Sequence, residues 1–274
     1  MISAPILLAA ALPLLPGEWF RYRVTVGFAE AGTASLAIAE PMSKGGRTLL
    51  PVRGAVEPSS FLRGFYRVRG EIVTWLDADG LLPVRTSYHR EDPHAKLHVE
   101  GRQEKPGRVT WRTTRNGRTR ESARTFREPI YDPIAALMTL RCHALAAGEV
   151  RELWLMDGLT LMRATATGGP IETLRLPVGE MRAQRIDGVI RRAGNPRPFR
   201  LWLTADAARL PVKLDGETRL GRTVVELIGY GREARERQHV PPRGLRQPER
   251  PVGRAEAAAK RPRAPARPRP PARR

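Results

Sequence analysis

The sequence has a single cysteine, which limits both redox chemistry and covalent stabilisation. Cys142 is the one thiol in 274 residues, so no disulfide can form within the chain. This composition fits a reduced compartment, and it equally fits a bacterial envelope protein that folds without disulfides. Because Cys142 lies beside an apolar pattern with helical spacing, we expect a buried and unreactive thiol.

Residue patterns that carry catalysis are also missing. The chain has no Gly-x-Ser-x-Gly nucleophile motif and no glycine-rich phosphate loop. His89, His94 and His98 lie near Glu91 and Asp92, but their surroundings predict strand and turn, where the helical spacing of metal ligands does not apply. We therefore expect no catalytic residue, no metal site and no cofactor, and a protein that is not an enzyme.

Lysine is rare although the chain is strongly basic. Five of its 48 basic residues are lysines, and the formal net charge is +20. Because arginine, alanine, proline and glycine all have GC-rich codons, part of this bias can reflect the genome. Residues 234–274 contain thirteen Arg or Lys and three Glu, which gives +10. Apolar residues are almost absent there, so we expect a disordered Arg/Pro/Ala-rich tail.

This basic tail has two interpretations, a solubilising segment or an electrostatic attachment to a polyanion. In the second, the candidate binding residues are the basic side chains closest to the end: Lys260, Arg261, Arg263, Arg267, Arg269, Arg273 and Arg274. If the protein is exported, we expect anionic envelope polymers or anionic lipids as partners, and we do not expect nucleic acid.

No apolar run is long enough to cross a membrane as a helix, which needs about 20 apolar residues. The longest run covers residues 1–15 and resembles the apolar region of a secretory signal, although no Lys or Arg precedes it. We expect residues 1–16 to be a signal-like segment that directs the protein to the periplasm or cell envelope. A buried N-terminal segment is the alternative.

The rest of the chain alternates with the period of β-strands. In residues 19–28, large apolar side chains alternate with other residues, which predicts a strand with one buried face. Turn signals recur about every 8–12 residues, and we read Gly168-Gly169-Pro170 and Asp215-Gly216 as two of them. At Asp132-Pro133 the period changes, and an N-cap followed by a favoured first helical residue predicts one short helix over 133–143. We expect a mainly β domain over 17–233, built as a strongly curved antiparallel sheet or open barrel.

Two segments repeat one pattern of Trp, Asp and Pro-Val. Residues 73–85 and 201–213 both read as strand, polar turn and strand, so they predict two hairpins of one design. Trp75 and Trp202, with Phe20 and Tyr22 of the first strand, are candidates for lining an apolar groove. Packing in the core is the alternative.

Besides the tail, basic residues also gather between residues 97 and 125, where short strands and an Asn-Gly turn are predicted. We interpret these arginines as a solvated sheet face, with a binding patch as the alternative: Arg108, Arg112, Arg115, Arg118, Arg120 and Arg124.

The order of these features resembles the DUF3108 family of bacterial exported proteins of unknown function. The resemblance covers about residues 17–230 and implies a mainly antiparallel β fold and an envelope location. It implies no catalytic residues. It rests on Gly17-Glu18, Gly32 with Ala34 and Leu36, the Asp132-Pro133 helix ending at Leu140-Arg141, Gly148, Asp157-Gly158, Glu172 with Leu174, Leu176-Pro177 with Gly179, and Trp202 with Asp206 and Pro211-Val212.

The hairpin at Trp202 is also similar to hairpins of periplasmic lipoprotein carriers of the LolA/LolB kind, whose curved sheet holds acyl chains. We therefore expect a non-enzymatic envelope protein that binds a lipid or other apolar ligand in the concavity of its sheet. The alternative is a packed scaffold whose basic tail attaches to anionic envelope polymers, lipids or nucleic acid.

Overall fold

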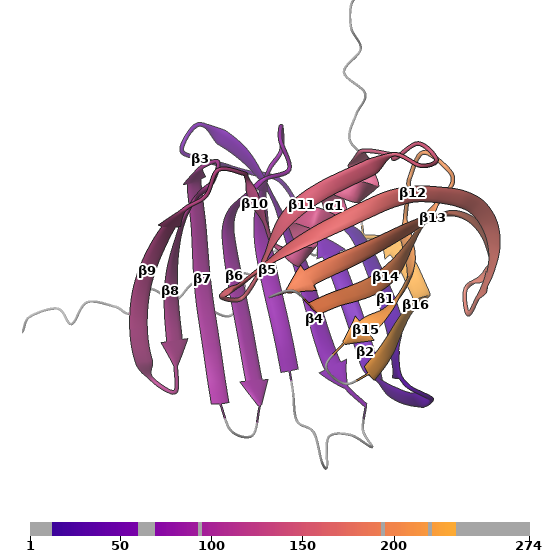
Figure 1. Cartoon of the computed structure of the whole chain (residues 1–274), viewed down its shortest axis with the longest axis horizontal. Coiled ribbons are helices and arrows are strands. Elements are labelled where there is room, and N and C mark those ends of the chain that lie inside the picture. The colour runs from indigo at the N-terminus through magenta and orange to yellow at the C-terminus, as the bar shows by residue number, and fades with distance from the viewer. Residues whose placement is uncertain (1–12, 60–68, 93–94, 193–194, 219–220, 234–274) are drawn as a thin grey trace, which may run out of the picture. The chain divides into compact units, whose positions relative to one another are not determined.

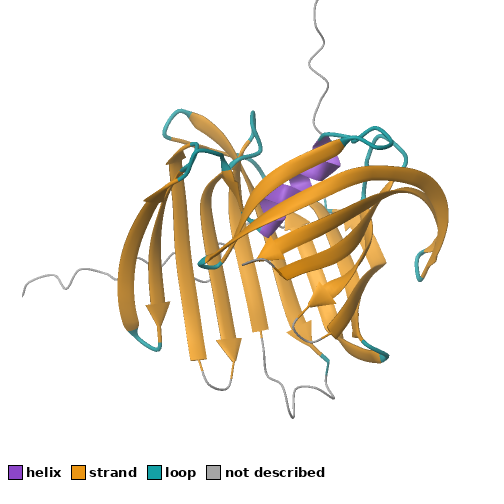
Figure 2. Ribbon diagram, in the orientation of Figure 1, coloured by secondary structure: helices purple, strands orange, loops and turns teal. Residues whose placement is uncertain are grey.

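The structure, a computed structural model, describes residues 13–59, 69–92, 95–192, 195–218 and 221–233. The chain divides into two units, residues 1–238 and 239–274, and all described residues belong to the first. The predicted disordered tail with its candidate basic residues, and most of the signal-like segment, lie outside the described residues. The described part consists of strands and one helix, which confirms the predicted fold class (Figure 1, Figure 2).

All sixteen strands of the described residues belong to one sheet. The first half of the chain contributes β1 Glu18–Val26, β2 Ala29–Ile38, β3 Met42–Lys44, β4 Arg47–Pro58, β5 Arg69–Asp77, β6 Pro83–Asp92, β7 Ala95–Lys105, β8 Arg108–Arg115 and β9 Arg118–Thr125. The second half contributes β10 Ile130–Tyr131, β11 Val150–Asp157, β12 Thr160–Leu176, β13 Gly179–Arg192, β14 Asn195–Thr204, β15 Pro211–Thr218 and β16 Gly221–Arg232.

The strand order is β10-β11-β12-β13-β14-β15-β16-β1-β2-β4-β5-β6-β7-β8-β9, with β3 paired beside β4. Each half of the chain is thus a meander, and the two meanders join where β1 pairs with β16. Pairing is antiparallel except between β10 and β11. The sheet ends at β9 on one side and β10 on the other, so it curves without closing, and β12 and β13 bend strongly (Figure 1).

The helix α1, Pro133–Cys142, lies on the concave side and contacts β5, β10 and β11. It begins where the sequence predicts, because Asp132 is an N-cap whose side chain accepts a hydrogen bond from the Ala135 N–H at 2.8 Å and Pro133 occupies the first turn. Most of its side chains are buried, since the curved sheet surrounds it.

The core fills the space between α1 and the sheet in adjoining apolar clusters. The largest includes Phe20, Ile38, Leu76, Met138 and Trp202, and the second packs the other side of the helix against β11 to β14. Leu14, which belongs to the predicted signal-like segment, is 6% exposed and packs in the largest cluster. The folded core therefore includes a residue from before the predicted start of the β domain.

The turn predicted at Gly168-Gly169-Pro170 is wrong, because β12 runs through these residues with only a shift of register between Gly168 and Ile171. A side chain at Gly168 would lie 2.1 Å from the Ala146 carbonyl oxygen, so glycine here permits a close backbone approach. The turn predicted at Asp215-Gly216 is also wrong, since β15 continues through it.

Candidate functional site

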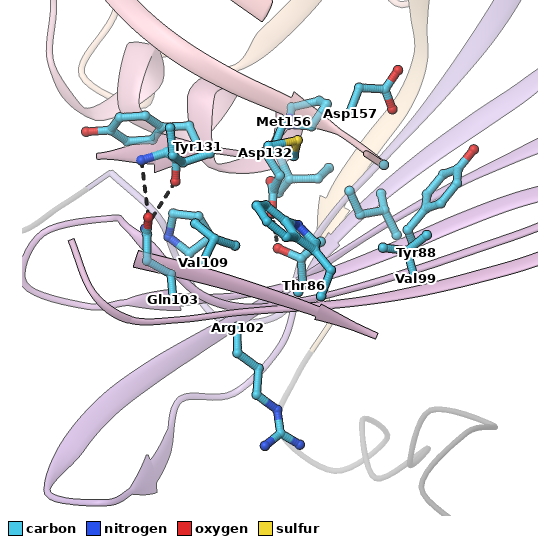
Figure 3. A pocket seen from close by; sticks show the side chains of 18 residues that line it. Thr86, Tyr88, Val99, Arg102, Gln103, Val109, Tyr131, Asp132, Met156 and Asp157 are labelled. Carbon is cyan, nitrogen blue, oxygen red and sulfur yellow. Dashed lines mark hydrogen bonds between the residues drawn. The ribbon is translucent and has the colours of Figure 1, made fainter. Parts of the chain in front are cut away.

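A cavity of about 170 Å³ lies on the concave side of the sheet, between β5 to β8 and the segment that starts α1 (Figure 3). The sheet contributes apolar groups such as Val99, Val109 and Trp111, and Ile130 and Met156 lie opposite them. These five residues also form the third core cluster, so the cavity is bounded by packed apolar side chains.

The cavity owes its space to a glycine in the middle of a buried strand face. Gly101 pairs with Thr86 on one side and Trp111 on the other. A Cβ atom added to Gly101 would meet Trp111 at 3.6 Å and Thr86 at 3.9 Å, which are ordinary contacts. Every other side chain of β7 points to this face, so Val99 and Gln103 border the same space while Arg102 points away from it (Figure 3).

Asp132 is the buried carboxyl group at the cavity, and the fold already uses both of its oxygens. Oδ2 accepts hydrogen bonds from Thr74 Oγ1 at 2.8 Å and Thr86 Oγ1 at 2.5 Å, and Oδ1 accepts the Ala135 N–H. Burial raises the pKa of Asp132, and these hydrogen bonds oppose that shift. The geometry therefore makes Asp132 a cap that fastens α1 to β5 and β6.

On the opposite side of the cavity, the Gln103 side chain joins β7 to β10 through hydrogen bonds. Its Nε2 donates to the Ile130 carbonyl at 3.1 Å, and its Oε1 accepts the N–H groups of Ile130 at 3.2 Å and Gly107 at 3.3 Å. The side-chain amide thus forms hydrogen bonds with backbone groups of β10, which pairs with one described strand, β11. The remaining surface of the cavity is mainly apolar, so it suits an apolar group.

Three of the four predicted groove residues lie together, but in the core. Phe20, Tyr22 and Trp202 belong to the largest cluster and are 2%, 8% and 5% exposed. The Tyr22 hydroxyl donates to the Pro211 carbonyl at 3.0 Å, and burial raises its pKa. The Trp202 indole N–H donates to a Glu172 carboxylate oxygen. None of the three borders the cavity.

Trp75 lies apart from the other three, in a small cluster with Leu49 and Val73. Its neighbour Thr74 bonds Asp132 on the concave side, so alternation along β5 places Trp75 on the other face. The Arg85 guanidinium lies 4.8 Å from its ring centroid. A ligand groove lined by all four residues stays a prediction, and the structure does not bring them to one place.

The two Trp hairpins share their irregularities as well as their sequence pattern. Trp75 pairs with Arg85 and the next residue with Pro83, whereas Trp202 pairs with Lys213 and the next residue with Pro211. Each hairpin thus has one extra residue at the same place, and each sets a cation over its Trp ring. In each copy the extra residue is the valine after the proline, and a β-bulge is a place where a strand tolerates proline.

Within the described ranges, no group of three His, Cys, Asp or Glu side chains is placed to hold a metal ion. No described helix has the length and apolar character needed to cross a membrane.

The family model DUF3108, described as a protein of unknown function, matches residues 21–228. The chain belongs to the DUF3108 family. No curated protein matches its sequence.

A solved structure resembles this DUF3108 chain in fold, and two others match it with lower scores. A β-barrel-like protein of the domain of unknown function DUF1849 from Brucella abortus has a TM-score of 0.55 and 12% identity, covering 80% of this chain and 98% of its own. A protein named as exported, with a YmcC-like fold, from Bacteroides fragilis has a TM-score of 0.38 and 7% identity, covering 81% and 98%. A protein named as a lipoprotein from Parabacteroides distasonis has a TM-score of 0.36 and 6% identity, covering 80% and 97%.

Two of the residues that suggested DUF3108 from sequence, Glu18 and Arg141, form a buried ion pair. Arg141, at the end of α1, donates from Nη1 and Nη2 to the Glu18 carboxylate at 2.8 and 3.0 Å, and from Nε to the Ala208 carbonyl at 3.1 Å. Arg209 in turn donates to the Arg141 carbonyl at 2.9 Å. The first strand, the helix end and the Trp202 hairpin are therefore joined at Arg141.

Sequence reasoning missed the cavity and this ion pair. Glu18 and Arg141 are 123 positions apart, and no local pattern connects them. Gly101 carried a usable signal, because it interrupts the run of large concave-face residues at Leu97, Val99 and Gln103.

Proposed function

We propose that this DUF3108 protein is a non-enzymatic cell-envelope protein that holds a small apolar group in the cavity beside Gly101. The cavity itself carries the proposal. Its volume of about 170 Å³ is close to that of engineered apolar cavities of ~150 Å³ that bind benzene. It is well below the ~300–1,000 Å³ of sites for drug-sized ligands. The size therefore favours a single ring or the end of one acyl chain over a whole lipid.

The polar groups at the cavity support binding rather than catalysis. The Asp132 carboxylate is occupied by two threonine hydroxyls and a backbone N–H, and Gln103 is occupied by β10. A general base needs a free lone pair within reach of its substrate. The proposed envelope location rests on the signal-like apolar residues 1–16.

Filling the cavity tests this function. The Gly101→Leu variant places a side chain in the space, and the backbone of Gly101 is not in the left-handed region, so we expect the fold to be retained. With decanol as the probe, isothermal titration calorimetry should show binding to the unaltered protein and none to Gly101→Leu. Binding that survives Gly101→Leu, or no binding to either protein, would refute the proposal.

Gly229→Leu is the matched control. Gly229 is also a strand glycine, and a Cβ added to it would meet Trp19 at 3.6 Å, the distance at which Gly101 would meet Trp111. It lies on β16 and does not border the cavity. We expect Gly229→Leu to bind decanol like the unaltered protein. Equal losses in both variants would mean that decanol binding reports general disturbance of the sheet.

A second candidate function is attachment through the basic tail, favoured by the +10 charge of residues 234–274. In this scheme the β domain is a packed scaffold, and the tail binds anionic polymers or lipids. Truncation after Gln238 should then abolish salt-sensitive sedimentation with vesicles of phosphatidylglycerol. If the truncated protein still sediments, the tail is not the attachment site.

A further inference from the structure

We infer that the ligand of the cavity is an amphiphile with one acyl chain and an anionic head group, a carboxylate or a phosphate. This inference rests on the proposed function, because it places the chain of the amphiphile in the cavity beside Gly101. Its basis is a row of arginines at the free edge of the sheet, on the same concave face as the cavity and one strand away from the residues that line it.

The pairing of β8 with β9 places these arginines. Arg124 lies directly opposite Val109, and Ser122 lies opposite Trp111, so both β9 residues share a face with side chains that border the cavity. Opposed residues of antiparallel strands have Cβ atoms about 5 Å apart. The alternation of β9 then puts Arg118 and Arg120 on the same face as Arg124. Arg115 of β8 lies directly opposite Arg118 and completes the arginine row, which is Arg115, Arg118, Arg120 and Arg124.

The arginine row is open to solvent. All eight residues of β9 are exposed, and β9 ends the sheet, so no strand from the described part of the chain covers its outer edge. Among the described residues, no carboxylate forms an ion pair with any of the four arginines. The ion pair of this hairpin joins Arg112 to Glu121 at 2.7 Å, and these two residues lie on the opposite face.

The arrangement also carries a cost to stability. Arg115 and Arg118 are directly opposite each other, and like charges in this position destabilise a strand pair. On the other face of the same two strands, Arg112 is matched with Glu121 instead. On the face of the β8–β9 hairpin away from the cavity, Glu121 neutralises Arg112, whereas the concave face carries four arginines. This difference favours an anionic ligand group on the concave face.

The acidic groups at the cavity do not oppose such a ligand strongly. Burial raises the pKa of Asp132, and its oxygens are covered by hydrogen bonds. Asp157 is the last residue of β11, and its carboxylate points away from the other labelled side chains (Figure 3). A ligand head placed near Arg124 would therefore meet a positive potential, and its chain would reach the apolar space next to Val109.

Three probes with one chain length separate the head group from the chain: decanoate, decyl phosphate and decanol, each titrated calorimetrically into the full-length protein. We expect the two anions to bind more tightly than decanol. In Arg120→Gln/Arg124→Gln, anion binding should weaken about two- to thirtyfold, the range for two exposed charge pairs, while decanol binding stays the same. Comparison of decanoate with decyl phosphate shows which of the two anionic groups is preferred.

Lys105→Gln/Arg108→Gln is the matched control, because it removes two charges from the opposite face of the neighbouring strand pair. Both residues are exposed, and we expect no change for any probe. Anion binding outside the cavity, including any binding to the basic tail, is measured in Gly101→Leu, where the cavity is filled, and is subtracted.

The outcomes separate this inference from the proposed function. If decanol binds and Gly101→Leu abolishes its binding, but the anions have no advantage, the proposed function stands and the anionic head group is refuted. The same conclusion follows if the advantage survives Arg120→Gln/Arg124→Gln, or if the control removes it equally. If no probe enters the cavity, the proposed function itself fails.

Discussion

The buried pair Glu18–Arg141 permits a quantitative prediction about stability. The Arg141 side chain is fully buried and lies 5.4 Å from the Phe20 ring centroid, and its only described carboxylate partner is Glu18. Glu18→Ala leaves a buried guanidinium with no counter-charge. Removal of one partner of a buried pair costs about 3–5 kcal/mol, so we expect the free energy of unfolding to fall by about that amount.

Replacement of both partners should cost much less than this single change. In Glu18→Leu/Arg141→Met no buried charge remains, and such apolar replacements are often neutral or stabilising. The hydrogen bonds from Arg141 to the Ala208 carbonyl and from the Leu15 N–H to Glu18 are still lost, and each contributes about 1 kcal/mol. We therefore expect the double variant to be more stable than Glu18→Ala.

Urea unfolding, followed by circular dichroism and tryptophan fluorescence, measures these differences. The slope of the unfolding free energy against urea should be the same in all variants, which shows that the same surface is exposed. A loss below about 1 kcal/mol in Glu18→Ala would contradict the reasoning, because that value is typical of a solvated surface pair. A double variant less stable than Glu18→Ala would contradict it equally.

Further predictions follow from three other sites. Burial raises the pKa of Asp132, so its contribution to stability is fully present below pH 3.8 and is lost as the pH rises through the raised pKa. The stability difference between the unaltered protein and Asp132→Asn, measured by urea unfolding, should fall with pH over that range, and a rise would contradict this assignment. Burial raises the pKa of Cys142 to about 11, so at pH 8 only about one thiol in a thousand is ionised. Ellman's reagent should label Cys142 about 200-fold more slowly than free cysteine unless urea is added. Trp75→Phe and Trp202→Phe should each lower the unfolding free energy by about 1 kcal/mol or more but leave decanol binding unchanged. Loss of decanol binding in either variant would indicate that the replaced tryptophan contacts the ligand.

Local chemistry made parts of this fold predictable. The start of α1 was found because an N-cap and a first-turn proline act within four residues. The paired hairpins at Trp75 and Trp202 were found because their spacing repeats. The shared bulge was not found, since it depends on how each partner strand is aligned.

Features that depend on distant contacts could not be read from the sequence. Gly168 looked like a turn residue, yet it is required because the Ala146 carbonyl approaches the strand. Gly101 interrupts a run of large residues in the sequence, but its position between Thr86 and Trp111, which leaves the space open, depends on strand pairing that the sequence does not show. The arginines of β9 were interpreted as a solvated sheet face, and only the pairing with β8 shows that four basic residues share one side with the cavity.

The pairing of β1 with β16 has a consequence for how the chain folds. The first strand to be synthesised finds one neighbour at once in β2, but its other neighbour is the last strand of the domain. Contacts that join such distant segments form slowly, because a long loop must close before they are made. The two meanders can therefore assemble independently, and the middle of the sheet is completed last. Until β16 arrives, the nascent chain exposes an unpaired β1 edge, which makes this stage of synthesis the most prone to aggregation.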